Sequence, residues 1–352
     1  MTDEITLKEI LSQPGVWKSV LDRSAGPGSG FAEAAALCSK RETVFVGCGT
    51  SYYLSMCAAS VFTRVTRTGS RAVPASDILF YPDHVLHRPA SETLGIVISR
   101  SGTTTEAVLA ARKIRTDLGI PACAVSCRPE SELVGVCDRA LLAEAADEKS
   151  VVMTRSFTSM LLTIQRLAAE CSRNGGYLAE LETLPRLGTG ILEKAAAIVP
   201  AIVRDRDWSS FVFLGQGPYY GLACEAMLKM KEMSLSISEA YHTLEYRHGP
   251  MSMVDDRMLI TFFVSDRGRS EETVLLGEMK KLGAKILAIC ENGRDGIRES
   301  SDYCLELNSG LSDSGRLILC MPLVQLLSCQ WARRKGIDAD HPRNLTQVVQ
   351  LS

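Results

Sequence analysis

Two short stretches of the 352-residue chain decide its fold: Thr43-Val-Phe-Val-Gly-Cys-Gly-Thr-Ser51 and Phe211-Val-Phe-Leu-Gly-Gln-Gly-Pro218. In each, an apolar run leads into Gly-X-Gly and then into a stretch of helix-forming residues. Further along, each copy has a second apolar run that ends in Ser and a Gly turn, at residues 95–102 and 259–268. The chain therefore contains an internal repeat, and a repeat of this kind sets the architecture.

The matched segments continue after each turn, with a helix-like stretch and another apolar run. Short buried strands that alternate with helices predict parallel sheets covered on both faces. We therefore predict an α/β protein with two tandem flavodoxin-like domains, the first closed by a helix near residues 154–171. The predicted divisions are an N-terminal helical segment at 1–34, a first domain at 35–171, a polar linker at 172–199, a second domain at 200–335, and a tail at 336–352 that closes the site.

Composition excludes several classes of protein. Lys and Arg total 39 against 41 for Asp and Glu, so the net charge is −2 and no nucleic acid or membrane surface is expected as a partner. No apolar run approaches the roughly 18 residues of a membrane span. The twelve cysteines form no C-x-x-C pair and no cluster at metal spacing. We expect a cytoplasmic protein with reduced thiols, no bound metal and no cofactor.

A candidate anion site follows the second strand of the first copy, where the chain reads Ser99-Arg-Ser-Gly-Thr-Thr-Thr105. Ligands of open parallel sheets bind at the carboxyl ends of the strands, where helix N-termini favour anions. Gly49-Thr-Ser51 supplies a similar cluster, and although Ser and Thr often only cap helices, two clusters at neighbouring strands favour a phosphate site. The second copy reads Ser265-Asp-Arg-Gly-Arg269 there, so we expect phosphate on the first domain alone.

A second candidate group lies on the helix expected at residues 224–233. Glu225, Lys229 and Glu232 stand at i, i+4 and i+7 and so share one face. An isolated Glu-x-x-x-Lys is usually an exposed salt bridge. The Arg247-His-Gly-Pro250 segment that follows favours a functional face instead.

Four motifs in this order resemble the sugar-isomerase (SIS) family, and specifically its aminosugar-phosphate isomerases, which include glucosamine-6-phosphate synthase and type II glucosamine-6-phosphate deaminases. They are Gly47-Cys-Gly-Thr-Ser51, Ser99-Arg-Ser-Gly-Thr-Thr104, Lys229-Met-Lys-Glu232 and Arg247-His-Gly-Pro250. The resemblance runs from about residue 40 to His341-Pro-Arg-Asn-Leu345. It implies two tandem SIS domains.

The resemblance also implies roles for individual residues. Glu232 would be the base that moves a proton between C1 and C2, with Lys229 beside it, and His248 would open the sugar ring, entering from a second subunit of a homodimer. The sugar 6-phosphate would be held by Ser51, Ser99, Ser101 and Thr104, with Arg100 as a cation. The substrate-binding residues implied are Cys48, Gly49, Thr50, Ser51, Ser99, Arg100, Ser101, Thr104 and Glu225.

Two positions depart from the synthase. Arg100 stands where the synthase has Gln, and Gln347 stands where it has a Lys that is implicated in ring opening. An amide cannot shuttle protons as an amine can. Ring opening would then fall to His248 and Lys229, or the substrate is already open-chain. The chain shows no N-terminal Cys nucleophile of a glutaminase, so we expect it not to make its own ammonia from glutamine.

The function expected first is conversion of an aminosugar 6-phosphate, such as glucosamine 6-phosphate, to fructose 6-phosphate and ammonia, or the reverse. A ketose-aldose isomerase and a fructosamine-phosphate deglycase remain open as alternatives. A non-catalytic sugar-phosphate-binding regulator is the alternative of another class. Residues 1–40 are too short and not basic enough for a DNA reader, which disfavours that alternative.

Overall fold

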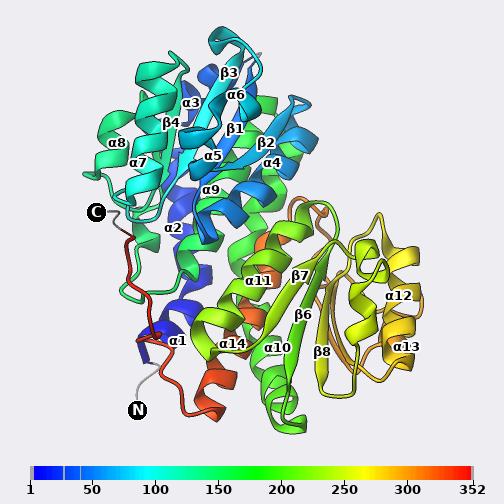
Figure 1. Cartoon of the computed structure of the whole chain (residues 1–352). Helices are drawn as coiled ribbons and strands as arrows, with labels where there is room; N and C mark the ends of the chain where they lie inside the picture. The colour runs from blue at the N-terminus through cyan, green and yellow to red at the C-terminus, as the bar shows by residue number, and fades with distance from the viewer. Residues whose placement is uncertain (1–3, 27, 40, 350–352) are drawn as a thin grey trace. The chain divides into compact units, whose positions relative to one another are not determined.

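The computed structural model describes residues 4–26, 28–39 and 41–349. They form two compact units, each built around one of the repeats (Figure 1). Of the described residues, the first unit contains those within 12–149, 153–185 and 346–349, and the second contains those within 4–11, 150–152 and 186–345.

The first unit is built on a parallel sheet of five strands in the order β2-β1-β3-β4-β5. This is the strand order of flavodoxin-like folds. Val44 of β1 pairs with Arg71 of β2 and with Gly95 of β3. The strands are β1 (Glu42–Gly47), β2 (Ser70–Pro74), β3 (Thr93–Ile98), β4 (Ala122–Ser126) and β5 (Arg139–Leu142).

Helices cover both faces of this sheet (Figure 1). Helices α4 and α9 pack on each other and against one face, while α5, α7 and α8 lie on the other. The core on the α7 side joins Val44, Val46 and Val97 of the sheet to Ala107 and Ala111 of α7. The helices are α2 (Gln13–Ala25), α3 (Phe31–Cys38), α4 (Thr50–Thr66), α5 (Ala75–Phe80), α6 (Pro82–Val85), α7 (Thr105–Arg112), α8 (Glu132–Val136) and α9 (Arg155–Ser172).

The second unit repeats this plan, with a parallel sheet in the order β10-β9-β8-β6-β7. Helices α11 and α14 pack together on one face, and α12 and α13 lie beside β9. The strands are β6 (Ser210–Gly215), β7 (Ser238–Tyr241), β8 (Met258–Phe263), β9 (Lys285–Cys290) and β10 (Tyr303–Glu306). The helices are α1 (Glu4–Leu11), α11 (Pro218–Ser234), α12 (Arg269–Lys281), α13 (Ile297–Ser300) and α14 (Met321–Arg334).

The Gly-X-Gly turns that defined the repeat have the same geometry in both units. A Cβ on Gly47 would lie 2.5 Å from the backbone of Ser51, and a Cβ on Gly215 would lie 2.3 Å from the Tyr219 carbonyl oxygen. Gly49 and Gly217 have φ angles of 53° and 58°, which side chains strongly disfavour. Both turns therefore require glycine, and the predicted repeat of parallel α/β units is confirmed.

The segment predicted as a linker is largely helical, because α10 (Gly175–Asp205) runs through most of residues 172–199. The division between the two units falls within this helix, between Pro185 and Arg186. The N-terminal segment is helical, as expected, but its helix α1 belongs to the second unit. There Asp340 accepts hydrogen bonds from the N–H groups of Ile5 and Thr6, at 3.2 and 2.8 Å. The predicted domain limits stay predictions.

The twelve cysteines all lie in the described residues, where no disulfide joins them, and each is buried or half-buried. No helix in the described part of the chain is long and apolar enough to cross a membrane. Within residues 4–26, 28–39 and 41–349, no group of three or more His, Cys, Asp or Glu side chains is arranged to hold a metal ion.

Candidate active site

The predicted phosphate loop joins β3 to α7 in the first unit. Ser99 Oγ accepts a hydrogen bond from the Gly102 N–H at 3.1 Å, and Ser101 Oγ accepts one from the Thr103 N–H at 3.2 Å. Ser99 also donates to Thr104 Oγ1 at 3.4 Å. Gly102 has a φ of 63°, and a Cβ on it would lie 2.0 Å from Ser131 Oγ, so no other residue fits there. The sequence thus folds these hydroxyls into one tight turn.

The second hydroxyl cluster lies beside the first at the carboxyl edge of the sheet, because β1 and β3 are neighbouring parallel strands. Thr50 and Ser51 form the first turn of α4, and both are nearly buried. The N-termini of α4 and α7 therefore start at the same edge of the sheet. Their partial positive charge and N–H groups favour an anion such as a phosphate.

Cys48, between the two glycines of the first loop, is a neutral thiol. Burial raises the pKa of Cys48 to about 12, and the nearby carboxylate of Glu106 acts in the same direction. A thiol in this state is not a nucleophile at neutral pH. It also places no negative charge where a phosphate would bind.

Arg100, predicted as a phosphate cation, points its guanidinium at protein groups. Its side chain is 4% exposed, and Nη1 lies 3.6 Å from Oε2 of Glu148, whose side chain is fully buried. Nη2 donates to the backbone oxygen of Gln347 at 3.0 Å. Arg100 is thus paired inside the first unit, and direct phosphate binding by it stays a prediction.

Glu148 was not singled out from the sequence, where it is one acid in an ordinary polar stretch. Its carboxylate accepts hydrogen bonds from the N–H and Oγ1 of Thr154, at 2.7 and 2.6 Å, and from Ser156 Oγ. Its backbone oxygen accepts from Gln347 Nε2 at 2.8 Å. The side-chain amide of Gln347, which stands where the family has a lysine, therefore hydrogen-bonds the backbone of Glu148. Closure of the site by the tail stays a prediction.

The acidic helix face of the second unit is buried, not exposed. Glu225 and Lys229 of α11 are 0% exposed, and the Glu232 side chain is 19% exposed. Lys229 Nζ lies 3.4 Å from Glu225 Oε1 and also contacts Glu232 Oε2. The structure therefore brings these three predicted side chains together, with one cation between two carboxylates.

Burial of this triad argues against ordinary surface decoration. The free energy needed to remove two ions from water is often larger than the free energy gained from their attraction. Buried ion pairs therefore contribute little to stability. Helix α11 is enclosed because it packs against β6, β7 and α14. Titratable groups held in such a setting are typical of functional sites.

His248 lies in an exposed loop of the second unit. It follows the 3-10 turn Leu244–Arg247, and its N–H donates to the Glu245 oxygen at 3.0 Å. Gly249, with a φ of 125°, turns the chain immediately afterwards. Arg247 is anchored on Glu278 at 2.8 Å, which holds the base of the loop.

A second histidine, His242, was missed because it belongs to no motif of its own. It follows β7 and stacks on Tyr220 of α11, with ring centroids 3.7 Å apart. Burial lowers its pKa, so the imidazole is neutral at pH 7. The two rings come together because β7 packs against α11, which the sequence alone does not indicate.

The corresponding loop of the second copy has the same turn, but charged side chains of the second unit form ion pairs there. Ser265 Oγ accepts from the Gly268 N–H at 2.9 Å, as Ser99 does from Gly102. Asp266 pairs with the buried Arg316 at 2.7 Å, and Asp313 pairs with the same guanidinium at 2.6 Å. Carboxylates at this edge disfavour a phosphate, which supports the expectation that the first domain binds it.

Glu272 completes this cluster, since its carboxylate accepts hydrogen bonds from the Ser265 N–H and Oγ at 2.7 and 3.2 Å. Burial raises the pKa of Glu272 from its ordinary value of 4.5 to about 7, against the two hydrogen bonds, and Asp313 adds to the rise. The folded state thus binds this proton more tightly than the unfolded state. The free energy of unfolding should therefore fall as the pH rises from about 4.5 to about 7.

Replacing Glu272 with Gln should remove this loss of stability. Relative to the unchanged protein, Glu272→Gln should gain on the order of 3 kcal/mol between about pH 5 and about pH 8. Chemical denaturation at the two pH values measures the gain. Glu271→Gln, at the exposed neighbouring position, is the control and should show no such gain. An equal gain in both variants would contradict the assignment to Glu272.

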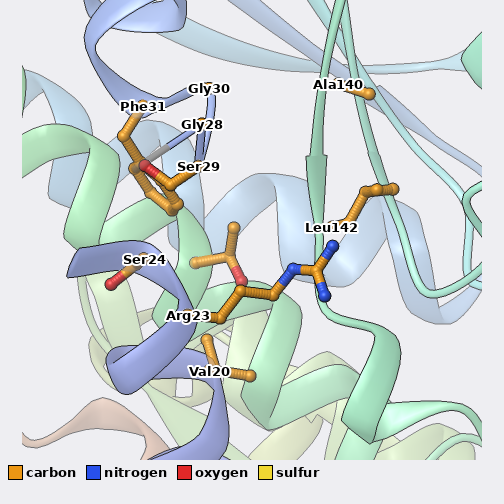
Figure 2. Close-up of a pocket in the computed structure, with 10 residues that line it drawn as sticks. Val20, Arg23, Ser24, Gly28, Ser29, Gly30, Phe31, Ala140 and Leu142 are labelled. Atoms are coloured by element: carbon orange, nitrogen blue, oxygen red, sulfur yellow. The ribbon is translucent and has the colours of Figure 1, made fainter. Parts of the chain in front are cut away.

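A small cavity elsewhere in the first unit has none of the predicted site residues in its wall (Figure 2). Its volume is about 90 Å³, and Arg23, Ser29 and Leu142 are among the residues that line it. Arg23 is paired with Glu144 at 2.5 Å. Ligand pockets usually measure about 300–1,000 Å³, so this cavity is too small for a sugar phosphate.

Comparison with known proteins identifies the family. The model of the SIS domain family matches residues 36–169 and again residues 206–327. The chain belongs to the SIS-domain family, in agreement with the resemblance found in its sequence.

Its similarity extends to individual proteins of this family. The chain is 31% identical over 360 residues to glutamine–fructose-6-phosphate aminotransferase (isomerizing) of Francisella tularensis, across 97% of this chain and 58% of the relative. It thus spans little more than half the length of that relative. The crystal structure of glucosamine-6-phosphate deaminase from Thermotoga maritima superposes with a TM-score of 0.82 at 29% identity, over 98% of this chain and 99% of that one.

Tagatose-6-phosphate ketose/aldose isomerase from Escherichia coli also superposes, with a TM-score of 0.84 over 96% of both chains. At 24% identity, this likeness shows the fold alone. Together the comparisons support a phosphosugar isomerase of the SIS type and leave its substrate open.

Proposed function

We propose that this phosphosugar isomerase acts on an aminosugar 6-phosphate and interconverts glucosamine 6-phosphate with fructose 6-phosphate and ammonia. The observation that carries the proposal is the buried triad of Glu225, Lys229 and Glu232 on α11. Similarity over nearly the whole chain to the Thermotoga deaminase supports the choice of substrate class.

The proposed reaction moves one proton and then releases ammonia. In the open-chain aldehyde, Glu232 removes the proton from C2, and the electrons form an enolamine across C1 and C2. Protonation at C1 gives a C2 imine, and water hydrolyses this imine to the ketose and ammonia. A carboxylate suits the first step because a positioned general base commonly raises the rate by a factor of about 10²–10⁴. Lys229, which contacts Glu232, stabilises the negative charge that develops on the substrate oxygen.

Recognition of the 6-phosphate falls to Ser51, Ser99, Ser101 and Thr104, with the backbone of Cys48, Gly49 and Thr50 in the adjoining turn. Hydroxyls and helix N-termini bind phosphate without needing a cation. Glu225 fixes Lys229 from its other side, at 3.4 Å. Ring opening falls to His248, because Gln347 cannot act as an amine and already hydrogen-bonds Glu148.

Comparison of substrates tests the proposal against its alternatives. Purified protein should release ammonia from glucosamine 6-phosphate faster than it converts tagatose 6-phosphate or cleaves a fructosamine 6-phosphate. Turnover of tagatose 6-phosphate without ammonia release from the amino sugar would favour the ketose-aldose isomerase. Tight binding of all three without turnover would favour the regulator.

We also propose that the protein is a cytoplasmic homodimer in which His248 serves the site of the second subunit. Twelve cysteines that form no disulfide in the described residues suit a reducing compartment. The exposed position of His248 suits a residue that acts on a neighbouring molecule.

Subunit mixing should reveal a shared site. His248→Ala and Glu232→Ala proteins should each be inactive, but a mixture should regain activity because each hybrid dimer holds one intact site. Of randomly mixed dimers about half are hybrids, so up to about one quarter of the unchanged activity should return. As a comparison, the same mixing is done with His242→Ala in place of His248→Ala, together with Glu232→Ala. No recovery from dimers shown to exchange subunits would contradict the shared site, and a monomer in sedimentation would exclude it.

A further inference from the structure

A buried ion pair ties the C-terminal segment, residues 346–349, to the phosphate loop of the first unit. We propose that Arg100 and Glu148 are positioning residues that fix this segment beside the loop, and that the Arg100 guanidinium is not itself a phosphate ligand. The second part rests on the proposed function, because it assumes that the loop binds phosphate. The anchoring of the segment does not depend on that assumption.

The guanidinium of Arg100 contacts Glu148 and Gln347 through different nitrogen atoms. Nη1 faces Glu148 Oε2 at 3.6 Å, and Nη2 donates to the Gln347 backbone oxygen at 3.0 Å. The backbone of Arg100 is fixed as well, since its oxygen accepts from the Cys127 N–H and from Ser126 Oγ, both at 3.1 Å. An arginine held at both ends in this way has a defined orientation.

Glu148 fixes the other side of the ion pair. Its carboxylate accepts from the N–H and hydroxyl of Thr154 and from Ser156 Oγ, in addition to facing Arg100. An ionised carboxylate only accepts hydrogen bonds, so a ring of donors suits it. Because the charges of Arg100 and Glu148 offset each other, the pair adds little net attraction for a phosphate dianion.

The C-terminal segment contacts both this group and the loop. Gln347 accepts from Arg100 through its backbone oxygen and donates through Nε2 to the backbone oxygen of Glu148 at 2.8 Å. Two residues later, the Val349 oxygen accepts from the N–H of Thr105, the first residue of α7, at 3.4 Å. Residues 346–349 therefore reach the N-terminus of α7, the helix that follows the phosphate loop.

Digestion of the full chain with a carboxypeptidase, read by intact mass, tests the anchor without any sugar. Loss of a hydrogen bond to a charged group should shift the equilibrium between the bound and the released segment by about tenfold or more. Removal of residues 346–349 should therefore be about tenfold faster in Arg100→Gln and in Glu148→Gln. Arg100→Lys, which keeps the charge, should restore part of the protection. Gln347→Ala should speed digestion while it leaves the ion pair intact.

Arg128→Gln is the matched control, because Arg128 pairs with Asp147 at 3.2 Å, next to Glu148 in the chain. It should leave digestion of the segment unchanged. If a single variant fails to fold, the double variant Arg100→Gln with Glu148→Gln leaves no buried charge unpaired and should still lose the protection. Digestion at the unchanged rate in the folded Arg100 and Glu148 variants would overturn the anchor.

Binding of inorganic phosphate, measured by calorimetry, tests the second part. Arg100→Gln should change its affinity less than about threefold, since a direct charged ligand would be worth about tenfold or more. A loss of tenfold or more would overturn the claim that Arg100 is not a phosphate ligand. Failure of the unchanged protein to bind phosphate would count against the proposed phosphate loop, while the digestion would still decide on the anchor.

Discussion

Replacement of Glu232 by Gln should abolish proton transfer and leave substrate binding intact. Glutamine keeps the shape of the side chain and can still accept a hydrogen bond from Lys229, which contacts Glu232 on α11. It lacks the basic lone pair, so the rate should fall by about 10²–10⁴. Exchange of the C2 proton of the substrate in heavy water should disappear together with turnover.

The control for this variant is Glu193→Gln, which neutralises an exposed carboxylate on α10 of the same unit. It should keep the unchanged rate of exchange. Calorimetry with glucosamine 6-phosphate separates loss of chemistry from loss of binding. If Glu232→Gln exchanges the C2 proton at the unchanged rate, the base lies elsewhere, and Glu225 and then Glu245 are the next residues to replace.

Loss of the hydroxyls of Ser101 and Thr104 should weaken sugar-phosphate binding at least tenfold. Hydrogen bonds to a charged phosphate are worth roughly 1.5–3 kcal/mol each, and the double change to Ala removes two donors from the loop. The effect should fall on the affinity, because these residues are proposed to hold the phosphate and not the reacting carbons. The dissociation constant from calorimetry measures it.

Ser270→Ala is the matched control, because Ser270 is an exposed hydroxyl in the first turn of α12, the corresponding helix of the second repeat. It should leave the dissociation constant unchanged. Thermal unfolding should show that both variants remain folded. An unchanged affinity in the Ser101 and Thr104 variant would exclude this loop as the phosphate site.

The central strands were predictable because buried parallel strands are almost wholly apolar. The runs around Val46, Ile98 and Leu214 form β1, β3 and β6. Strands β2 and β7, at the edges of the sheets, gave no such signal, since they are short and half-exposed. The edges of both sheets therefore emerged only from the structure.

Helix α10 was missed for a different reason. Its glycines and Pro185 are poor helix formers, and local propensity predicts a break there. Leu181, Leu184 and Ala195 are nonetheless fully buried and recur at helical spacing. Packing of this apolar face outweighs the local preference.

The candidate site was predictable where motifs place residues on one helix face or one loop, as for Glu225, Lys229 and Glu232. Its long-range pairings were not. Arg100 meets Gln347 across 247 positions of the chain, and Glu148 joins them. No local pattern in the sequence indicates such contacts. The pairing of Arg100 is the basis of the positioning role that we propose for it.

Incubation of the purified protein with glucosamine 6-phosphate in heavy water tests the central claim most directly. The account predicts release of one ammonia for each fructose 6-phosphate formed, with deuterium from the solvent at C1 of the product, because the proton taken from C2 exchanges before protonation at C1. Nuclear magnetic resonance of the sugar and an ammonia assay measure both. Saturable binding of glucosamine 6-phosphate with neither ammonia nor deuterium incorporation would contradict the claim that this chain is an aminosugar-phosphate isomerase.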